Sequence, residues 1–79
     1  MRKICIVEKY IYTLFDATIE LEDYTVATVY GITISEENNS ATVDDISNDF
    51  NFVLELFDMI VEGELCPEHL EDVVEDYLS

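Results

Sequence analysis

The C-terminal half of the chain is unusually rich in carboxylates. Twelve Asp and Glu residues lie between Asp44 and Asp76, and this stretch contains no Lys or Arg. Carboxylates one helical turn apart are separated by about 5.4 Å, which is comparable to the spacing of about 3.4 Å between phosphates along one DNA strand. Such a surface can occupy a basic channel in place of nucleic acid. The candidate partner-binding residues are Asp44, Asp45, Glu64, Glu68, Glu71, Asp72, Glu75 and Asp76.

Two other groups of residues have the chemistry, but not the pattern, of a metal site. Cys66 and His69 have C-x-x-H spacing, and Cys5 is a third potential ligand. Zinc normally takes four well-placed ligands, usually in paired motifs. The acids around Asp44 and Asp49 lack the spacing of a calcium-binding EF-hand loop. We therefore expect no metal site and no cofactor.

Catalytic motifs are also missing from the sequence. There is no G-x-S-x-G nucleophile motif, no phosphate-binding P-loop and no plausible Ser, His and Asp order. A chain of 79 residues has little room for a cleft that holds two working carboxylates. We expect a protein that is not an enzyme and has no catalytic residues.

The elements that carry these residues change in type once along the chain. Apolar residues fall on even positions from Ile4 to Leu14 and on odd positions from Phe15 to Leu21, which predicts a turn or bulge near Asp16. A stretch rich in Val, Ile, Thr and Tyr follows. The pattern predicts strands over about 3–15, 17–22 and 25–35. Residues 41–44 form either a short fourth strand or a connection into the helices.

From Ser47 onward, the apolar spacing becomes three and four, which indicates helices. The first helix is predicted over about 49–62, with Gly63 as its left-handed C-terminal residue, and the second over about 67–78, with Pro67 at its first position. The expected fold is a single α+β domain over residues 1–79. It has a three- or four-stranded antiparallel sheet with both C-terminal helices on one face.

The first helix is apolar around most of its circumference. Phe52, Leu56 and Met59 lie beside the main apolar stripe and leave a narrow polar strip. Either a small α+β domain buries most of this helix between the sheet and the second helix, or these three residues form a surface for self-association or partner binding.

Composition excludes several classes of partner. Nineteen Asp and Glu face three Lys and Arg, which gives a formal charge of −16, while 49% of the residues are hydrophobic. Direct binding to nucleic acid or an anionic membrane needs basic residues that the chain lacks. Neither a membrane-spanning segment nor a signal peptide is recognisable, so we expect a cytoplasmic protein, with Cys5 and Cys66 as free thiols rather than one long bridge.

Three short segments resemble a known family. They are Tyr30-Gly31-Ile32, Asp45-Ile46-Ser47 and the closing GELCPEHLEDVVEDYL. These are similar to an uncharacterised family of small proteins from anaerobic Gram-positive bacteria, and the likeness covers roughly residues 30–78. The family's Pro, His, Leu, Asp and Val are matched by Pro67, His69, Leu70, Asp72 and Val73. Cys66 stands where the family usually has Ser. The resemblance implies the architecture and carries no activity.

Two functional hypotheses from different classes follow. The first is a stoichiometric inhibitor that mimics nucleic acid and occupies the basic site of a nucleic-acid-binding enzyme. Mobile elements use inhibitors of this kind against basic nucleases, including CRISPR effectors. The hypothesis is an analogy from charge and size. The second is a homodimeric housekeeping interaction module that uses the Phe52, Leu56 and Met59 flank. Binding by mimicry weakens steeply with salt, whereas an apolar interface is nearly indifferent to it.

Overall fold

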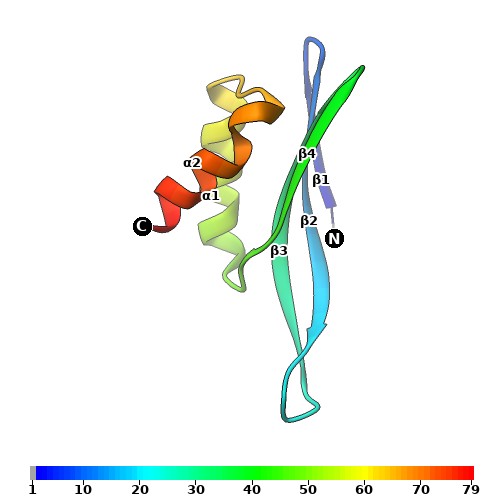
Figure 1. Cartoon of the computed structure of the whole chain (residues 1–79), viewed down its shortest axis with the longest axis vertical. Helices are drawn as coiled ribbons and strands as arrows, with labels where there is room; N and C mark the ends of the chain where they lie inside the picture. The colour runs from blue at the N-terminus through cyan, green and yellow to red at the C-terminus, as the bar shows by residue number, and fades with distance from the viewer. Residues whose placement is uncertain (1) are drawn as a thin grey trace.

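The computed structural model describes residues 2–79 as an antiparallel sheet followed by two helices (Figure 1). The strands pair in chain order, and both helices lie on one face of the sheet. This confirms the α+β fold with a four-stranded sheet. The elements are β1 (Arg2–Val7), β2 (Tyr10–Glu20), β3 (Val26–Glu36), β4 (Asn39–Ser47), α1 (Phe50–Glu62), the 3₁₀ turn η1 (Pro67–His69) and α2 (Leu70–Leu78).

The predicted first strand, 3–15, is wrong, because it contains a turn. Val7 pairs with Tyr10, so Glu8 and Lys9 form a tight hairpin turn, with Glu8 in the left-handed region at φ 54°. Neither Gly nor Asn marks this turn in the sequence. The predicted break near Asp16 is also wrong, since β2 runs without interruption from Tyr10 to Glu20.

The fourth strand is longer than the predicted 41–44. It runs from Asn39 to Ser47, and its pairing with β3 shifts between Tyr30 and Ile32. Asp45 has φ 50° at this irregularity, which is consistent with the sharp change of direction that a bulge gives a strand. Asp44 and Asp45 therefore lie within a strand rather than in a connection to the helices.

Both helices lie close to where the sequence places them. Asp49 caps α1 by accepting hydrogen bonds from the backbone N–H groups of Asn51 and Phe52 at 3.1 and 3.3 Å. At the other end, Gly63 keeps helical angles, and Glu64 is the left-handed residue at φ 50°. The left-handed C-terminal residue is therefore Glu64, one position after the predicted Gly63. The N–H of Leu65 donates to the carbonyl of Ile60, as in a Schellman motif centred on Glu64.

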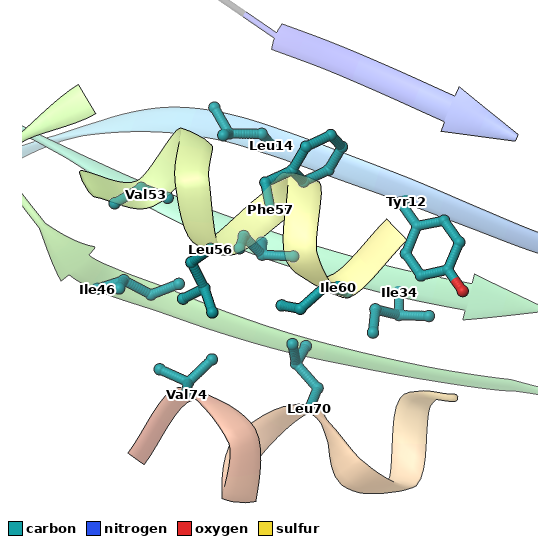
Figure 2. Close-up of a cluster of buried hydrophobic side chains, with 11 residues drawn as sticks. Tyr12, Leu14, Ile34, Ile46, Val53, Leu56, Phe57, Ile60, Leu70 and Val74 are labelled. Atoms are coloured by element: carbon teal, nitrogen blue, oxygen red, sulfur yellow. The ribbon is translucent and has the colours of Figure 1, made fainter. Parts of the chain in front are cut away.

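The hydrophobic core lies between the sheet and the helices (Figure 2). Tyr12 and Leu14 of β2 face Phe57 of α1, and Val74 of α2 enters from the side of β4. All four residues are at most 2% exposed. Burial of the apolar faces of α1 and α2 fixes both helices against the sheet, so their charged faces point outward.

Candidate functional site

The outer surface of α2 carries four of the predicted partner-binding acids. Glu71, Asp72, Glu75 and Asp76 are all exposed, because Leu70 and Val74 hold the opposite side of the helix in the core. Glu71 lies one turn before Glu75, and Asp72 lies one turn before Asp76. The four carboxylates therefore form two columns, and the two residues within each column are about 6 Å apart along the helix axis. No basic residue lies in the last turn of α2.

The outer surface of α1 adds three acids that were not among the predicted binding residues. Glu55, Asp58 and Glu62 are exposed along this helix, which has no basic residue in its last turn. Their spacing of three and four, together with the absence of Lys and Arg, was a sufficient signal in the sequence. We call the exposed acids of the two helices the acidic helical layer: Glu55, Asp58, Glu62, Glu71, Asp72, Glu75 and Asp76.

The two lysines of the chain lie near carboxylates at the rim of the sheet. Lys3 Nζ lies 3.7 Å from Asp58 Oδ1, and Lys9 Nζ lies 3.5 Å from Glu36 Oε2. The nearby Tyr10 and Glu36 raise the pKa of Lys9. Both lysines are mostly exposed, so these contacts contribute little to stability. Among the described residues, one acid of the helical layer, Asp58, has a lysine within salt-bridge distance.

Glu68 differs from the other predicted binding residues because it joins two parts of the fold. Its carboxylate accepts a hydrogen bond from Asn39 Nδ2, at the turn between β3 and β4. A hydrogen bond with the Cys66 thiol lowers the pKa of Glu68 and raises the pKa of Cys66. The contact therefore favours the thiol form of Cys66 over the thiolate. We assign Glu68 to positioning η1, not to the acidic helical layer.

The remaining predicted acids do not gather on one surface element. Asp44 and Asp45 are exposed in β4, and Glu64 is exposed at the end of α1. Asp45 and Glu64 both occupy left-handed backbone positions, which gives each a local role in shaping the chain. The structure therefore brings together the α2 acids and separates the others by element.

The predicted self-association flank does not form one surface. Leu56 is fully buried and points from α1 toward the side of α2 in Figure 2. The Phe52 ring packs on Tyr77 with ring centres 5.0 Å apart, while Met59 is 47% exposed. The second helix covers this side of α1. Most of α1 is therefore buried between the sheet and α2, which was the first of the two alternatives, and the three residues do not form one exposed interface.

The sequence singled out Cys5, Cys66 and His69 as a potential half-site for a metal. Both thiols are free and half-buried, and His69 is exposed in η1. Within residues 2–79, no three His, Cys, Asp or Glu side chains gather in an arrangement that could hold a metal ion. No helix among the same residues is long and apolar enough to span a bilayer.

Taken together, the fold defines a small α+β protein whose helices present carboxylates on their outer surface. The chain belongs to the family of unknown function DUF6514, whose family model matches residues 2–79. This confirms the expectation of an uncharacterised family, and the match covers nearly the whole chain. No curated protein and no solved structure gave a match.

Proposed function

We propose that this is a non-enzymatic, acidic protein-binding protein that inhibits a nucleic-acid-binding partner by occupying its basic site. The acidic helical layer is the binding surface, and it takes the place of a nucleic acid backbone. Basic nucleases of defence systems, including CRISPR effectors, are a partner class with such a site. The bacterial cytoplasm is the compartment where such a partner would be met.

The observation that carries this proposal is the arrangement of acids on α2. Glu71 and Asp72 lie in the first turn, where carboxylates favour the positive end of the helix dipole. Glu75 and Asp76 lie toward the negative end, where each costs some tenths of a kcal/mol, and no basic residue of that turn offsets them. Folding alone does not favour these two acids, which supports a role outside the folded chain.

The competing explanation is that the acids only keep an apolar protein in solution. A solubilising charge needs no particular place and is effective wherever water contacts the surface. Here seven acids lie on the outer surface of two adjacent helices, whereas the three basic residues all lie within the first nine positions. Neither helix carries a Lys or Arg of its own, although Lys3 of β1 lies 3.7 Å from Asp58. The helices therefore present mainly negative charge, which favours directed binding because such a field steers a basic partner toward them.

The homodimeric housekeeping module remains a second proposal, but not through the helix flank. Burial of Leu56 and the packing of Phe52 on Tyr77 leave Met59 alone as an exposed apolar residue on that side.

Capture of partners from a cell lysate at low and high salt tests the proposed function. The wild-type chain is immobilised, and excess duplex DNA or a neutral polymer is added as competitor. Mimicry predicts capture of a basic protein that is lost in high salt and displaced by DNA, but not by the neutral polymer. Capture that resists both high salt and DNA would contradict the proposal.

A further inference from the structure

The sheet face turned away from the helices is apolar and uncovered by any of residues 2–79. Register places the even-numbered positions of β1 and the odd-numbered positions of β2 and β3 on this face, since Ile4 pairs with Thr13 and Thr13 with Thr33. We call it the open sheet face. Both helices pack on the other face (Figure 1).

Several large apolar side chains of the open sheet face are exposed to water. Ile6 is 69% exposed, and its cross-strand partner Ile11 is 41% exposed. Ile4, two positions before Ile6, is 57% exposed. An antiparallel sheet with one solvated face normally alternates apolar and polar residues so that the wet side is polar. Here both sides are apolar.

The open sheet face also differs from the rest of the molecule in charge. None of its positions on β1, β2 or β3 is Asp or Glu, although 19 of the 79 residues are acidic. Arg2 is the one charged residue at those positions. The other side of the same strands carries acids, among them Glu20 and Glu36. On β1, β2 and β3 the acids therefore lie on the other side of the sheet, whereas on β4 the exposed Asp44, two positions after Thr42, lies on the side of the open sheet face.

The centre of the open sheet face is closely packed. The Phe15 ring covers Gly31 so closely that a Cβ there would lie 2.6 Å from Phe15 Cζ, and nearby Val29 is 5% exposed. Thr33 and Thr42 share a hydrogen bond of 2.9 Å between their hydroxyls. An open hollow of about 320 Å³ lies between Arg2, Thr13, Phe15 and Thr33. The result is a preformed surface that can receive another apolar surface.

We propose that the open sheet face binds a second copy of this chain, so that the protein is a dimer with its two sheets packed face to face. A chain of formal charge −16 repels its own copies over most of its surface. The part of the open sheet face on β1, β2 and β3 is where two copies can meet without carboxylates opposing each other. A two-fold axis would bring the same apolar patch of each copy together, as in an isologous interface.

The area of the open sheet face suits such a dimer. Four strands of 6 to 11 residues, at about 3.4 Å per residue and about 4.8 Å apart, give roughly 600 Å² per copy. Two copies would bury about 1,200 Å², at the lower end of the range of about 1,200–2,000 Å² for stable interfaces. Packed sheets also supply the additional core that chains below about 80 residues often obtain by oligomerisation.

This dimer does not depend on the proposed function, although the two are compatible. Each copy places its helices on the side of its sheet away from the interface, so the dimer would present two acidic helical layers on opposite surfaces. Self-association can be measured in the absence of any partner, so failure of one proposal leaves the other intact.

Sedimentation velocity of the full chain, from micromolar to millimolar concentration, gives the first test. The wild type is expected to be a dimer whose affinity is unchanged or higher in strong salt, because salt screens repulsion between the copies. The affinity of the acidic helical layer for a basic partner is expected to fall in strong salt instead. A wild type that stays monomeric at millimolar concentration in strong salt would overturn the proposal.

A pair of matched variants locates the interface. Ile6→Lys introduces an ammonium group on the open sheet face, and Val26→Lys introduces one at an equally exposed strand position, 68% against 69%, on the other side of the sheet. Ile6→Lys should raise the dissociation constant at least about a hundredfold, since each dimer would bury two such groups. Val26→Lys should leave it unchanged. Equal effects of the two variants would overturn the proposed interface.

A measurement on the wild type covers the case in which Ile6→Lys also perturbs folding. Mixed labelled and unlabelled chains are examined for intermolecular nuclear Overhauser effects between the methyl groups of Ile4, Ile6 or Ile11 and the Phe15 ring. Face-to-face packing predicts such contacts. Contacts confined to the backbone of β1 would show pairing of sheet edges and overturn the proposal.

Discussion

The Tyr12 hydroxyl donates a hydrogen bond of 2.9 Å to the Leu65 carbonyl, across 53 positions of sequence. This contact ties the middle of β2 to the connection between α1 and η1. Tyr12 is fully buried, and within residues 2–79 no buried side-chain nitrogen or oxygen lacks a partner. The bond therefore helps to set where the second helical segment, and with it the α2 acids, begins.

Replacing Tyr12 by Phe should lower the free energy of unfolding by about 1–2 kcal/mol, because the Leu65 carbonyl loses its donor while the ring still fills the core. Urea unfolding measures the change. Tyr24→Phe is the matched control, since Tyr24 is 86% exposed and should give no change. Equal stabilities for Tyr12→Phe and the control would contradict this role of the hydroxyl.

Tyr12 should also make stability depend on alkaline pH. Burial raises its pKa from the ordinary value of 10.0 to about 12, with smaller contributions from neighbouring Tyr10 and Glu64. The folded state holds the proton more tightly than the unfolded state, so this contribution is complete below pH 10 and is lost as pH rises through 12. Unfolding free energies from pH 9 to about 12 should fall more steeply for the wild type than for Tyr12→Phe. Parallel curves would show that Tyr12 titrates normally.

Phe57 is expected to be a principal contributor to stability. Its side chain is 1% exposed at the centre of the core, between α1 and the sheet. Phe57→Ala should cost about 3–5 kcal/mol, because it removes apolar burial and leaves a cavity. Met59→Ala, two positions along the same helix and 47% exposed, serves as the control and should cost much less. A loss below about 1 kcal/mol for Phe57→Ala would contradict its place in the core.

The two glycines should respond in opposite ways to alanine. At Gly31 a Cβ would lie 2.7 Å from the Val43 carbonyl oxygen and 2.9 Å from the Asp44 Cα, both backbone atoms that cannot easily move. We expect Gly31→Ala to destabilise the protein by about 1–3 kcal/mol. At Gly63 the nearest such atom is 3.4 Å away and the backbone is helical, so Gly63→Ala should be neutral or stabilising by up to about 1 kcal/mol. Thermal melts of both variants measure the two changes, and equal melting temperatures for Gly31→Ala and Gly63→Ala would contradict the prediction.

The helices could be predicted from sequence because their apolar faces repeat at spacings of three and four over many residues. Asp49 and Pro67 mark their starts by capping and by proline geometry. The end of α1 differs from the prediction, because the left-handed position falls on Glu64 rather than on Gly63. Glycine is the residue that most often takes the left-handed position at a helix end, so the sequence pointed to Gly63, one residue before Glu64.

The strands were harder to predict because both faces of the sheet are apolar. The even-position pattern predicts one face for Ile4, Ile6 and the apolar residues of β2 from Tyr10 to Leu14, but the turn at Glu8 places the two isoleucines on the open sheet face. Likewise, Phe15 and the odd positions after it are apolar because they lie on that same face, not because the strand breaks. An alternating pattern cannot show register when each face supplies its own apolar residues.

The acids of the candidate site were only partly predicted. Exposure of the α2 acids followed from the helical period, whereas the contact of Glu68 with Asn39 depends on the packing of η1 against β4. Residues 29 positions apart in sequence meet there through tertiary structure, which no local pattern records.

Neutralising the α2 acids tests the central claim most directly. One variant carries Glu71→Gln, Asp72→Asn, Glu75→Gln and Asp76→Asn, and the matched control carries Glu8→Gln, Glu20→Gln, Glu22→Gln and Glu37→Gln, four exposed acids outside the helices. Each variant removes four negative charges from the same total of −16.

Interferometry on the partner captured from lysate, run beside thermal melts, compares the two variants at several salt concentrations. The account predicts that the α2 variant melts at or above the wild-type temperature, because repulsion is relieved, and binds at least about a hundredfold more weakly, mainly through slower association. The control should lose far less affinity. Equal affinities for the wild type, the α2 variant and the control, with unchanged melts, would contradict the claim that the acidic helical layer is the binding surface.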